Sequence, residues 1–159
     1  MPGIPKQRQQ NRMKWPAGLA AGLLATLLAV PAMATEASWP DLRASLFGGR
    51  YLATSNDVIS IEAPYRTDND ARTDVTVRLA APDGQAFRKL HLILDENPMP
   101  VSAELDFARP LAAFEFAATM RFNGPTAVHA VGELDNGQLF VAETFVKTSG
   151  LGACSAPPG

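Results

Sequence analysis

The only cysteine of the chain, Cys154, is the residue whose type and position best suit a chemical role. It is the sixth residue from the end of the sequence, within the segment Ser-Gly-Leu-Gly-Ala-Cys-Ser-Ala-Pro-Pro-Gly. A structural cysteine is normally buried as a small apolar side chain, and this segment offers little apolar surface to bury it. Gly150 and Gly152 add backbone freedom. We therefore expect an accessible thiol on a flexible arm that carries a covalent adduct; from composition alone, an incidental free thiol is the alternative.

The two histidines, His91 and His129, do not make a metal site by their pattern. They lie far apart in the sequence, each within a run of alternating apolar residues, and the chain has no second thiol to complete a ligand set. We expect both side chains to be structural or solvated. The sequence predicts neither a metal nor another cofactor.

The acidic residues do not predict catalysis either. Asp68, Asp70 and Asp74 lack the glycine and the terminal glutamate of a calcium-binding loop, so we expect them to lie in a solvated loop. Asp95 and Glu96 are adjacent, and adjacent side chains of an extended segment point to opposite sides, which disfavours a cooperating acid/base pair. With no phosphate loop or nucleophile–base set in the sequence, we predict that the protein is not an enzyme.

The elements that must hold these residues are mostly β-strands. Ser38 to Asp41 has the residues of a helix start, and apolar residues at helical spacing before Gly48-Gly49 predict one short helix over residues 39–47. Beyond it the apolar residues alternate, and the runs end at turn sequences such as Asp135-Asn136-Gly137. This pattern predicts an all-β sandwich of about seven strands, at residues 58–62, 75–79, 90–94, 102–107, 114–120, 126–134 and 138–147.

The first 34 residues are typical of an export signal. An uncharged, Leu- and Ala-rich run at residues 15–30 follows a basic segment and precedes the small-x-small site Ala32-Met33-Ala34. A membrane-spanning helix usually needs about 20 apolar residues, which disfavours an uncleaved anchor. We predict a signal peptide at 1–34, cleaved after Ala34, a sandwich domain at 35–148 and a flexible cysteine-bearing arm at 149–159.

The charge of the mature chain excludes several partners. The removed segment contains four basic residues, so 10 Lys+Arg (14 minus 4) remain against 16 Asp+Glu, a formal charge of −6. An acidic surface without a basic run repels phosphate backbones and anionic lipids. We therefore expect neither nucleic-acid binding nor, after signal cleavage, membrane association. In an exported protein, a single cysteine suggests either a working nucleophile or an intermolecular disulfide.

Four short motifs resemble the SoxY family of sulfur carriers. They occur in family order, and the resemblance covers essentially the whole mature chain: Trp39 to Gly48, Ile61 to Pro64, Glu96 to Pro100, and Phe145 to Gly150 ahead of the cysteine. The chain is most similar to SoxY-like carriers encoded beside quinoprotein dehydrogenases. The resemblance implies an immunoglobulin-like sandwich in the periplasm, a heterodimer with a SoxZ-like sandwich, and sulfur intermediates carried on Cys154 between oxidising enzymes.

Two departures from the family pattern bear on the role. The arm reads Gly-Leu-Gly-Ala-Cys-Ser-Ala-Pro-Pro rather than the Gly-Gly-Cys-Gly-Gly of thiosulfate-oxidising carriers, which disfavours thiosulfate oxidation as the role. Many dehydrogenase-associated relatives also continue into a fused SoxZ-like half, whereas this sequence ends at Gly159. The nature of the cargo stays open. The alternative function is a non-catalytic assembly module whose cysteine is incidental or forms an intermolecular disulfide.

Overall fold

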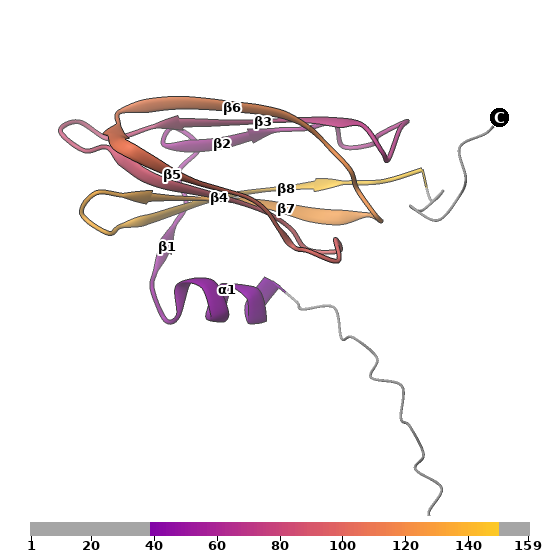
Figure 1. Cartoon of the computed structure of the whole chain (residues 1–159), viewed down its shortest axis with the longest axis horizontal. Coiled ribbons are helices and arrows are strands. Elements are labelled where there is room, and N and C mark those ends of the chain that lie inside the picture. Colours follow the sequence, from indigo (N-terminus) through magenta and orange to yellow (C-terminus); the bar gives the residue numbers. More distant parts are fainter. Residues whose placement is uncertain (1–38, 150–159) are drawn as a thin grey trace, which may run out of the picture. The chain divides into compact units, whose positions relative to one another are not determined.

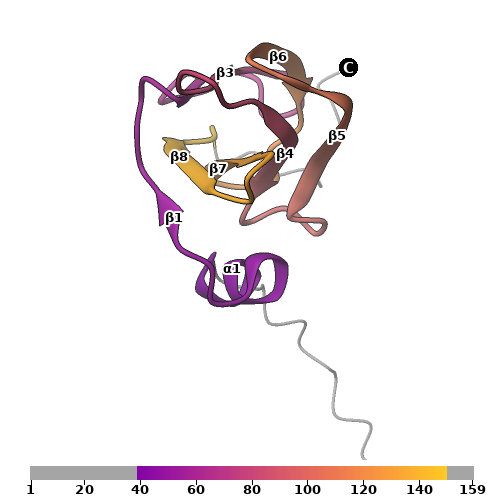
Figure 2. The same cartoon turned by 90° about the vertical axis from the view of Figure 1, so that its left-hand side faces the viewer.

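The computed structural model describes residues 39–149, which form one short helix and eight strands in two packed sheets (Figures 1 and 2). The five-stranded sheet has the order β1-β8-β7-β4-β5 and the other sheet the order β2-β3-β6. All neighbouring strands are antiparallel except β1 and β8. The elements are α1 (Trp39–Phe47), β1 (Leu52–Ala53), β2 (Ile59–Glu62), β3 (Thr73–Ala80), β4 (Phe87–Leu94), β5 (Val101–Leu111), β6 (Ala113–Met120), β7 (Thr126–Leu134) and β8 (Leu139–Val146).

The core lies between the two sheets and follows the alternation of the sequence. In β3, Val75, Val77 and Leu79 are buried, while Asp74, which precedes them, and Arg78, which lies among them, are exposed. Side chains of an extended strand point alternately to the two faces, so every second residue of β3 enters the core. The predicted Ig-like all-β sandwich is confirmed, with eight strands rather than about seven. The additional strand is β1, whose two residues are too few to show a period.

One glycine of β7 is required by the packing of the core. A Cβ atom on Gly132 would lie 2.5 Å from Cε1 and 2.9 Å from Cδ1 of Phe87, a fully buried residue of the neighbouring strand β4. The ring of Phe87 therefore packs directly on the bare backbone of Gly132. Any other residue at position 132 would displace the ring of Phe87 from this place in the core.

The helix α1 covers the outer face of the five-stranded sheet. Its predicted bounds, residues 39–47, are confirmed, and it ends at Gly48, which has a positive φ of 61° and donates its N–H to Ala44. Figure 2 shows α1 on the side of this sheet that faces away from the three-stranded sheet. A second small core forms there from Phe47, Leu52, Ile93, Val131 and Leu139. Strands β4 and β7 are consequently buried on both faces.

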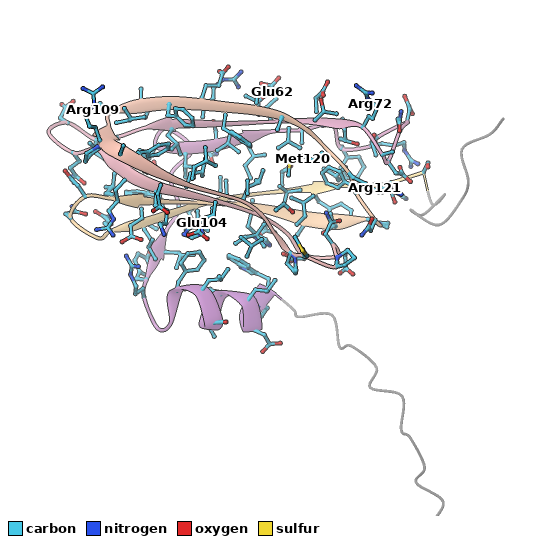
Figure 3. The ribbon with its side chains drawn as sticks, in the orientation of Figure 1. Glu62, Arg72, Glu104, Arg109, Met120 and Arg121 are labelled. Carbon is cyan, nitrogen blue, oxygen red and sulfur yellow. The ribbon has the colours of Figure 1, made fainter. Side chains whose placement is uncertain are left out.

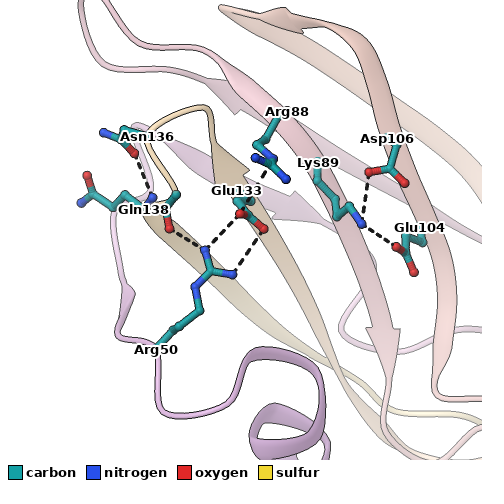
Figure 4. A network of polar contacts seen from close by, with 9 residues as sticks. Arg50, Arg88, Lys89, Glu104, Asp106, Glu133, Asn136 and Gln138 are labelled. Atoms are coloured by element: carbon teal, nitrogen blue, oxygen red, sulfur yellow. Dashed lines mark hydrogen bonds and ion pairs between the residues drawn. The ribbon is translucent and has the colours of Figure 1, made fainter.

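A polar network on the same outer face holds the segment between α1 and β1. Arg50 pairs with Glu133 of β7 at 3.1 Å and donates to the carbonyl of Gly137 in the β7–β8 turn (Figure 4). Farther along the sheet, Lys89 pairs with Glu104 and Asp106 of β5. Exposed pairs of this kind stabilise a fold only weakly, so the network mainly fixes the position of the segment between α1 and β1.

No helix within residues 39–149 is long and apolar enough to cross a membrane.

Candidate functional site

The predicted carrier residue lies beyond the last residue that the structure describes. Cys154, Gly150 and Gly152 fall outside residues 39–149, whereas Ser149, the first residue of the predicted arm, falls inside them. Ser149 precedes Cys154 by five positions. The structure therefore defines the base of the arm, and the candidate site is built from the residues that hold this base.

Just after β8, further backbone hydrogen bonds hold the chain to the loop before β3. Lys147, the residue after β8, donates its N–H to the carbonyl of Tyr65 at 2.7 Å and accepts a bond from the N–H of Thr67 at 3.0 Å. These bonds form a short parallel bridge between Arg66 and Lys147. The loop before β3 thus continues the pairing of β8 beyond the end of the sheet. The next residue, Thr148, is buried.

Asp70 fastens the first residue of the arm with both oxygens of its carboxylate. Oδ1 accepts the backbone N–H of Ser149 and Oδ2 accepts its hydroxyl, each at 2.9 Å. Asp70 is 8% exposed, and within residues 39–149 no ion pair joins its carboxylate to a cation. Hydrogen bonds to a carboxylate are roughly twice as strong as those between neutral groups. The two residues lie 79 positions apart, so this contact is a long-range one.

The loop that presents Asp70 is held by its own side chains. The hydroxyl of Thr67 accepts the N–H of Asn69 at 3.1 Å and the hydroxyl of Thr73 at 2.7 Å. The side-chain oxygen of Asn69 accepts the N–H of Ala71, a common turn arrangement for this residue type. Both threonines are buried. The turn around Asp70 is therefore ordered by local bonds, independently of Ser149.

Asp70 also connects the base of the arm to the segment between β6 and β7. Its carbonyl accepts the N–H of Phe122 at 2.7 Å, and the ring of Phe122 is fully buried in the core. On either side of Phe122, the carbonyl of Arg121 accepts a bond from the side-chain nitrogen of Asn97, and the N–H of Asn123 donates to its side-chain oxygen. One chain of contacts therefore runs from Ser149 through Asp70 to the loop after β4.

A surface pocket lies at this same end of the sandwich. Val146, the last residue of β8, pairs with Thr126, the first of β7, so the base of the arm lies beside the connections that precede β7 and follow β4. Figure 1 shows these segments at one end, and Figure 3 labels Arg72, Met120 and Arg121 there. The pocket, of about 340 Å³, is lined by Asn97, Pro98, Met99, Ser102, Met120, Arg121 and Asn123. The motif at residues 96–100 therefore contributes to this end of the molecule.

The two histidines lie beneath α1 on the neighbouring strands β4 and β7, in diagonal positions. In the register of β4 and β7, Ile93 is opposite His129 and His91 is opposite Val131. His129 is 1% exposed, with Nε2 3.2 Å from the carboxylate of Asp95. His91 is 7% exposed, and burial lowers its pKa although the carboxylate of Glu104 acts in the opposite direction. Of the two expected alternatives, structural or solvated, the burial of both side chains agrees with the structural one.

The acidic residues are placed differently from the expectation of a solvated loop. Asp68 is exposed, but Asp70 is buried, and the exposed Asp74 accepts a bond from the hydroxyl of Thr119. The expectation was wrong for Asp70 because its partner, Ser149, is far away in the sequence. Asp95 points to His129 rather than forming a pair with its neighbour. Within residues 39–149 there is no group of three or more His, Cys, Asp or Glu that could hold a metal ion.

Sequence reasoning missed the contact between Asp70 and Ser149. The available signal was weak: a run of turn-forming residues at 67–72 and a serine at the point where the apolar alternation of β8 stops. Neither feature indicates that the two segments meet.

The fold and the site define a class of protein: an immunoglobulin-like sandwich whose last strand leads, through a fastened residue, into a cysteine-bearing C-terminal segment. The chain matches the model of the family described as sulfur oxidation protein SoxY over residues 43–154, about 70% of its length (112 of 159 residues). The chain belongs to the SoxY family.

Solved structures agree with this assignment. The chain is similar to the sulfur carrier protein SoxY from Chlorobium limicola f thiosulfatophilum, with 27% identity and a TM-score of 0.57 over 67% of this chain and 88% of that one. A putative superoxide reductase from Thermotoga maritima shares the fold alone, with 14% identity and a TM-score of 0.52 over 62% of this chain and 95% of that one. No curated protein matches the sequence.

Proposed function

We propose that this protein is a covalent carrier that presents sulfur-containing intermediates on Cys154 to partner oxidising enzymes. The observation that carries the proposal is the extent of the family match, which continues past the last strand and ends at residue 154, the cysteine itself. The similar protein from Chlorobium limicola f thiosulfatophilum is described as a sulfur carrier. The ordered base of the arm at Ser149 supports the same role, because a carrier needs a defined point from which its arm reaches.

The chemistry asked of the carrier is modest. When the cargo is inorganic sulfur, loading joins the sulfur of Cys154 to a sulfur atom of the cargo; the thiol proton is released, and two electrons pass to the docked oxidising enzyme. The thiolate is the reactive form, and the segment after Ser149 contains no Lys, Arg or His to lower the pKa of the thiol by proximity. We therefore place activation on the partner enzyme. In this proposal the protein itself is not an enzyme and needs no cofactor.

The compartment and the subgroup belong to the same proposal. We place the mature protein in the periplasm after cleavage behind Ala34, on the basis of the basic and apolar character of residues 1–34. The arm sequence Ala-Cys-Ser-Ala-Pro favours carriers that work beside quinoprotein dehydrogenases over thiosulfate-oxidising ones. Inorganic sulfur and an alcohol-derived or one-carbon thiol adduct are the two classes of cargo to distinguish.

The heterodimer with a SoxZ-like sandwich is supported by an open side of the molecule. Strands β5 and β6 are the end strands of the two sheets, they are connected by one residue, and neither contains a fully buried side chain. Their inward side chains pack on the core but remain half-buried: Ala103, Leu105, Phe107, Phe114, Phe116 and Met120. We call this set the β5–β6 seam. The opposite side is closed, since Ile59 of β2 and Val146 of β8 are fully buried.

The free backbone edge of β5 and the charge on the outer face of this strand indicate what would cover the β5–β6 seam. The free edge of β5 offers unpaired N–H and C=O groups to an added strand. The exposed carboxylates of Glu104 and Asp106 line the outer face of β5, so a strand added there is favoured if its outward residues are basic. We propose that the occupant is an edge strand of the SoxZ-like partner in which apolar and basic residues alternate.

Accurate intact mass of protein purified from the periplasm tests the carrier function. Cells grown on different sulfur and carbon sources should yield a mass increase that a thiol reductant removes and that localises to the C-terminal peptide. The Cys154→Ser variant should lack the adduct and fail to support substrate oxidation. Unmodified protein throughout active metabolism would contradict the proposal. Full activity of Cys154→Ser would favour the alternative, an assembly module whose cysteine is incidental or forms an intermolecular disulfide.

A further inference from the structure

We propose that Asp70 is the positioning residue of the carrier arm: its carboxylate fixes Ser149 as the pivot and so sets the distance within which Cys154 delivers its cargo. This inference rests on the proposed carrier function. Its basis is the paired contact at 2.9 Å between the carboxylate of Asp70 and the N–H and hydroxyl of Ser149. A carboxylate suits this task because its two oxygens accept both donors at once.

The contact is built rather than incidental. Burying a carboxylate without a cation is costly unless hydrogen bonds satisfy it, and Asp70 is 8% exposed with Ser149 as its partner. Its position is fixed from two sides, by the Thr67–Thr73 hydroxyl pair within the loop and by the bond from the N–H of Phe122 to its carbonyl. A strand end that merely needed to stop would not require a buried charge.

The position of the pivot determines the reach of the thiol. Cys154 follows Ser149 by five positions, and a fully extended chain spans at most about 3.3–3.6 Å per residue, so the thiol operates within about 18 Å of the pivot. Without Asp70, the last backbone bond to the domain is that of Lys147 to Thr67. The tether would then gain two residues and reach about 25 Å.

A longer tether dilutes the cargo at a docked active site. Effective concentration falls roughly as the −3/2 power of tether length, so extension from five to seven residues lowers it about 1.7-fold. Loss of the fixed starting direction lowers it further. Asp70 thus acts through Ser149 on delivery and has no contact with the cargo in this proposal.

The test uses the mature protein and three variants, each with a nitroxide spin label on its single cysteine for the mobility measurement and with the free thiol for the other two measurements. Asp70→Ala removes both acceptors, and Asp70→Asn keeps an acceptor for the N–H of Ser149 together with a donor for its hydroxyl. Asp68→Ala is the matched control, because it removes one exposed carboxylate from the same loop. The readouts are amide hydrogen exchange of Ser149, mobility of the label on Cys154, and the rate at which the partner enzyme processes the cargo.

Asp70→Ala is expected to accelerate exchange of the Ser149 amide on the order of ten-fold, to increase label mobility and to slow cargo processing at least two-fold. Asp70→Asn should return each of the three measurements most of the way to its wild-type value, and Asp68→Ala should match the wild type. Ser149→Ala, at the last described residue, serves if Asp70→Ala does not fold; it loses the hydroxyl bond to Asp70 and should show intermediate label mobility.

Wild-type exchange and mobility in Asp70→Ala, or a wild-type processing rate despite a loosened base, would overturn the inference. Failure of the carrier function itself has a different signature. In that case Cys154→Ser supports substrate oxidation as well as the wild type does, whatever the exchange data show.

Discussion

Trp39, the first residue of α1, lies flat on the imidazole ring of His129, with ring centroids 3.8 Å apart and ring planes at 7°. At the other end of the helix, Phe47 meets the ring of His91 edge-on, with centroids 5.3 Å apart and planes at 83°. The two histidines are on adjacent strands of one sheet. One aromatic–imidazole contact at each end therefore fastens α1 across β4 and β7.

Substitution of Trp39 by alanine should release the first turn of α1 from the sheet. The variant loses the stacked contact with His129 and uncovers the small core beneath the helix, so we expect a loss of about 2 kcal/mol in the free energy of unfolding. Urea denaturation followed by circular dichroism measures the loss. Tryptophan fluorescence does not serve, because the other tryptophan, Trp15, lies in the predicted signal peptide and the mature variant would contain none. Tyr51→Ala, at a 78% exposed site, is the control and should change stability little.

Stability should decrease as the pH falls below neutrality, and His91 should contribute to this decrease. Burial lowers the pKa of His91 in the folded state below its ordinary value of about 6.5. The unfolded chain therefore binds more protons than the folded one as the pH falls through 6.5, and stability is lost in that range. The groups around the ring are Lys89, Glu104, Asp106 and Glu133, together with the Phe47 side chain.

The His91→Leu variant isolates this contribution. Its free energy of unfolding, measured by urea denaturation between pH 7.5 and 5, should depend less on pH than that of the wild type, because the leucine does not titrate. Equal pH dependence in the two proteins would show that His91 does not act in this way.

Gly132→Ala should destabilise the core by about 2 kcal/mol, because the new Cβ would overlap the ring of Phe87. Combining it with Phe87→Leu should recover part of the loss, since the smaller side chain makes room. Gly124 has open space around its Cα, so Gly124→Ala is the matched control. Thermal unfolding of the wild type, Gly132→Ala, Phe87→Leu and the double variant measures the coupling between the two substitutions. Additive losses in the double variant would contradict the packing argument.

The β5–β6 seam predicts where the SoxZ-like partner binds. Leu105→Lys places a charge among the half-buried apolar residues of the seam and should weaken the complex at least ten-fold in calorimetric titration. Ala117→Lys, at an exposed position of β6, adds the same charge outside the seam and should leave affinity unchanged. If both variants bind like the wild type, the partner uses another surface; if the wild type itself does not bind, the proposed partner is wrong.

Local patterns predicted most of the fold. The bounds of α1 follow from its cap residues and Gly48, and the turn at residues 135–137 follows from an Asn-Gly pair in which Gly137 has a φ of 86°. The strand over Val101–Leu111 is longer than the predicted 102–107, because Pro110 stood as a break in the sequence. Pro110 is accommodated since β5 is an end strand with a register irregularity beside it.

The site was less predictable than the fold. The thiol and its glycines could be named from composition, but the base of the arm depends on a pair of residues 79 positions apart. The same holds for the burial of His91 and His129, which results from the docking of α1 rather than from their own strands. Side-chain contacts between distant segments leave no period in the sequence.

The antiparallel pairing of β7 and β8 has a mechanical consequence for a protein that is pulled by its tail. Eight residue pairs join these strands, from Thr126–Val146 to Glu133–Leu139, and their hydrogen bonds lie perpendicular to the strands. A force on Ser149 parallel to β8 loads these bonds together in shear, whereas a force perpendicular to the strand would break them one after another. A pull on Ser149 along the axis of β8 is therefore resisted by all of these hydrogen bonds at once.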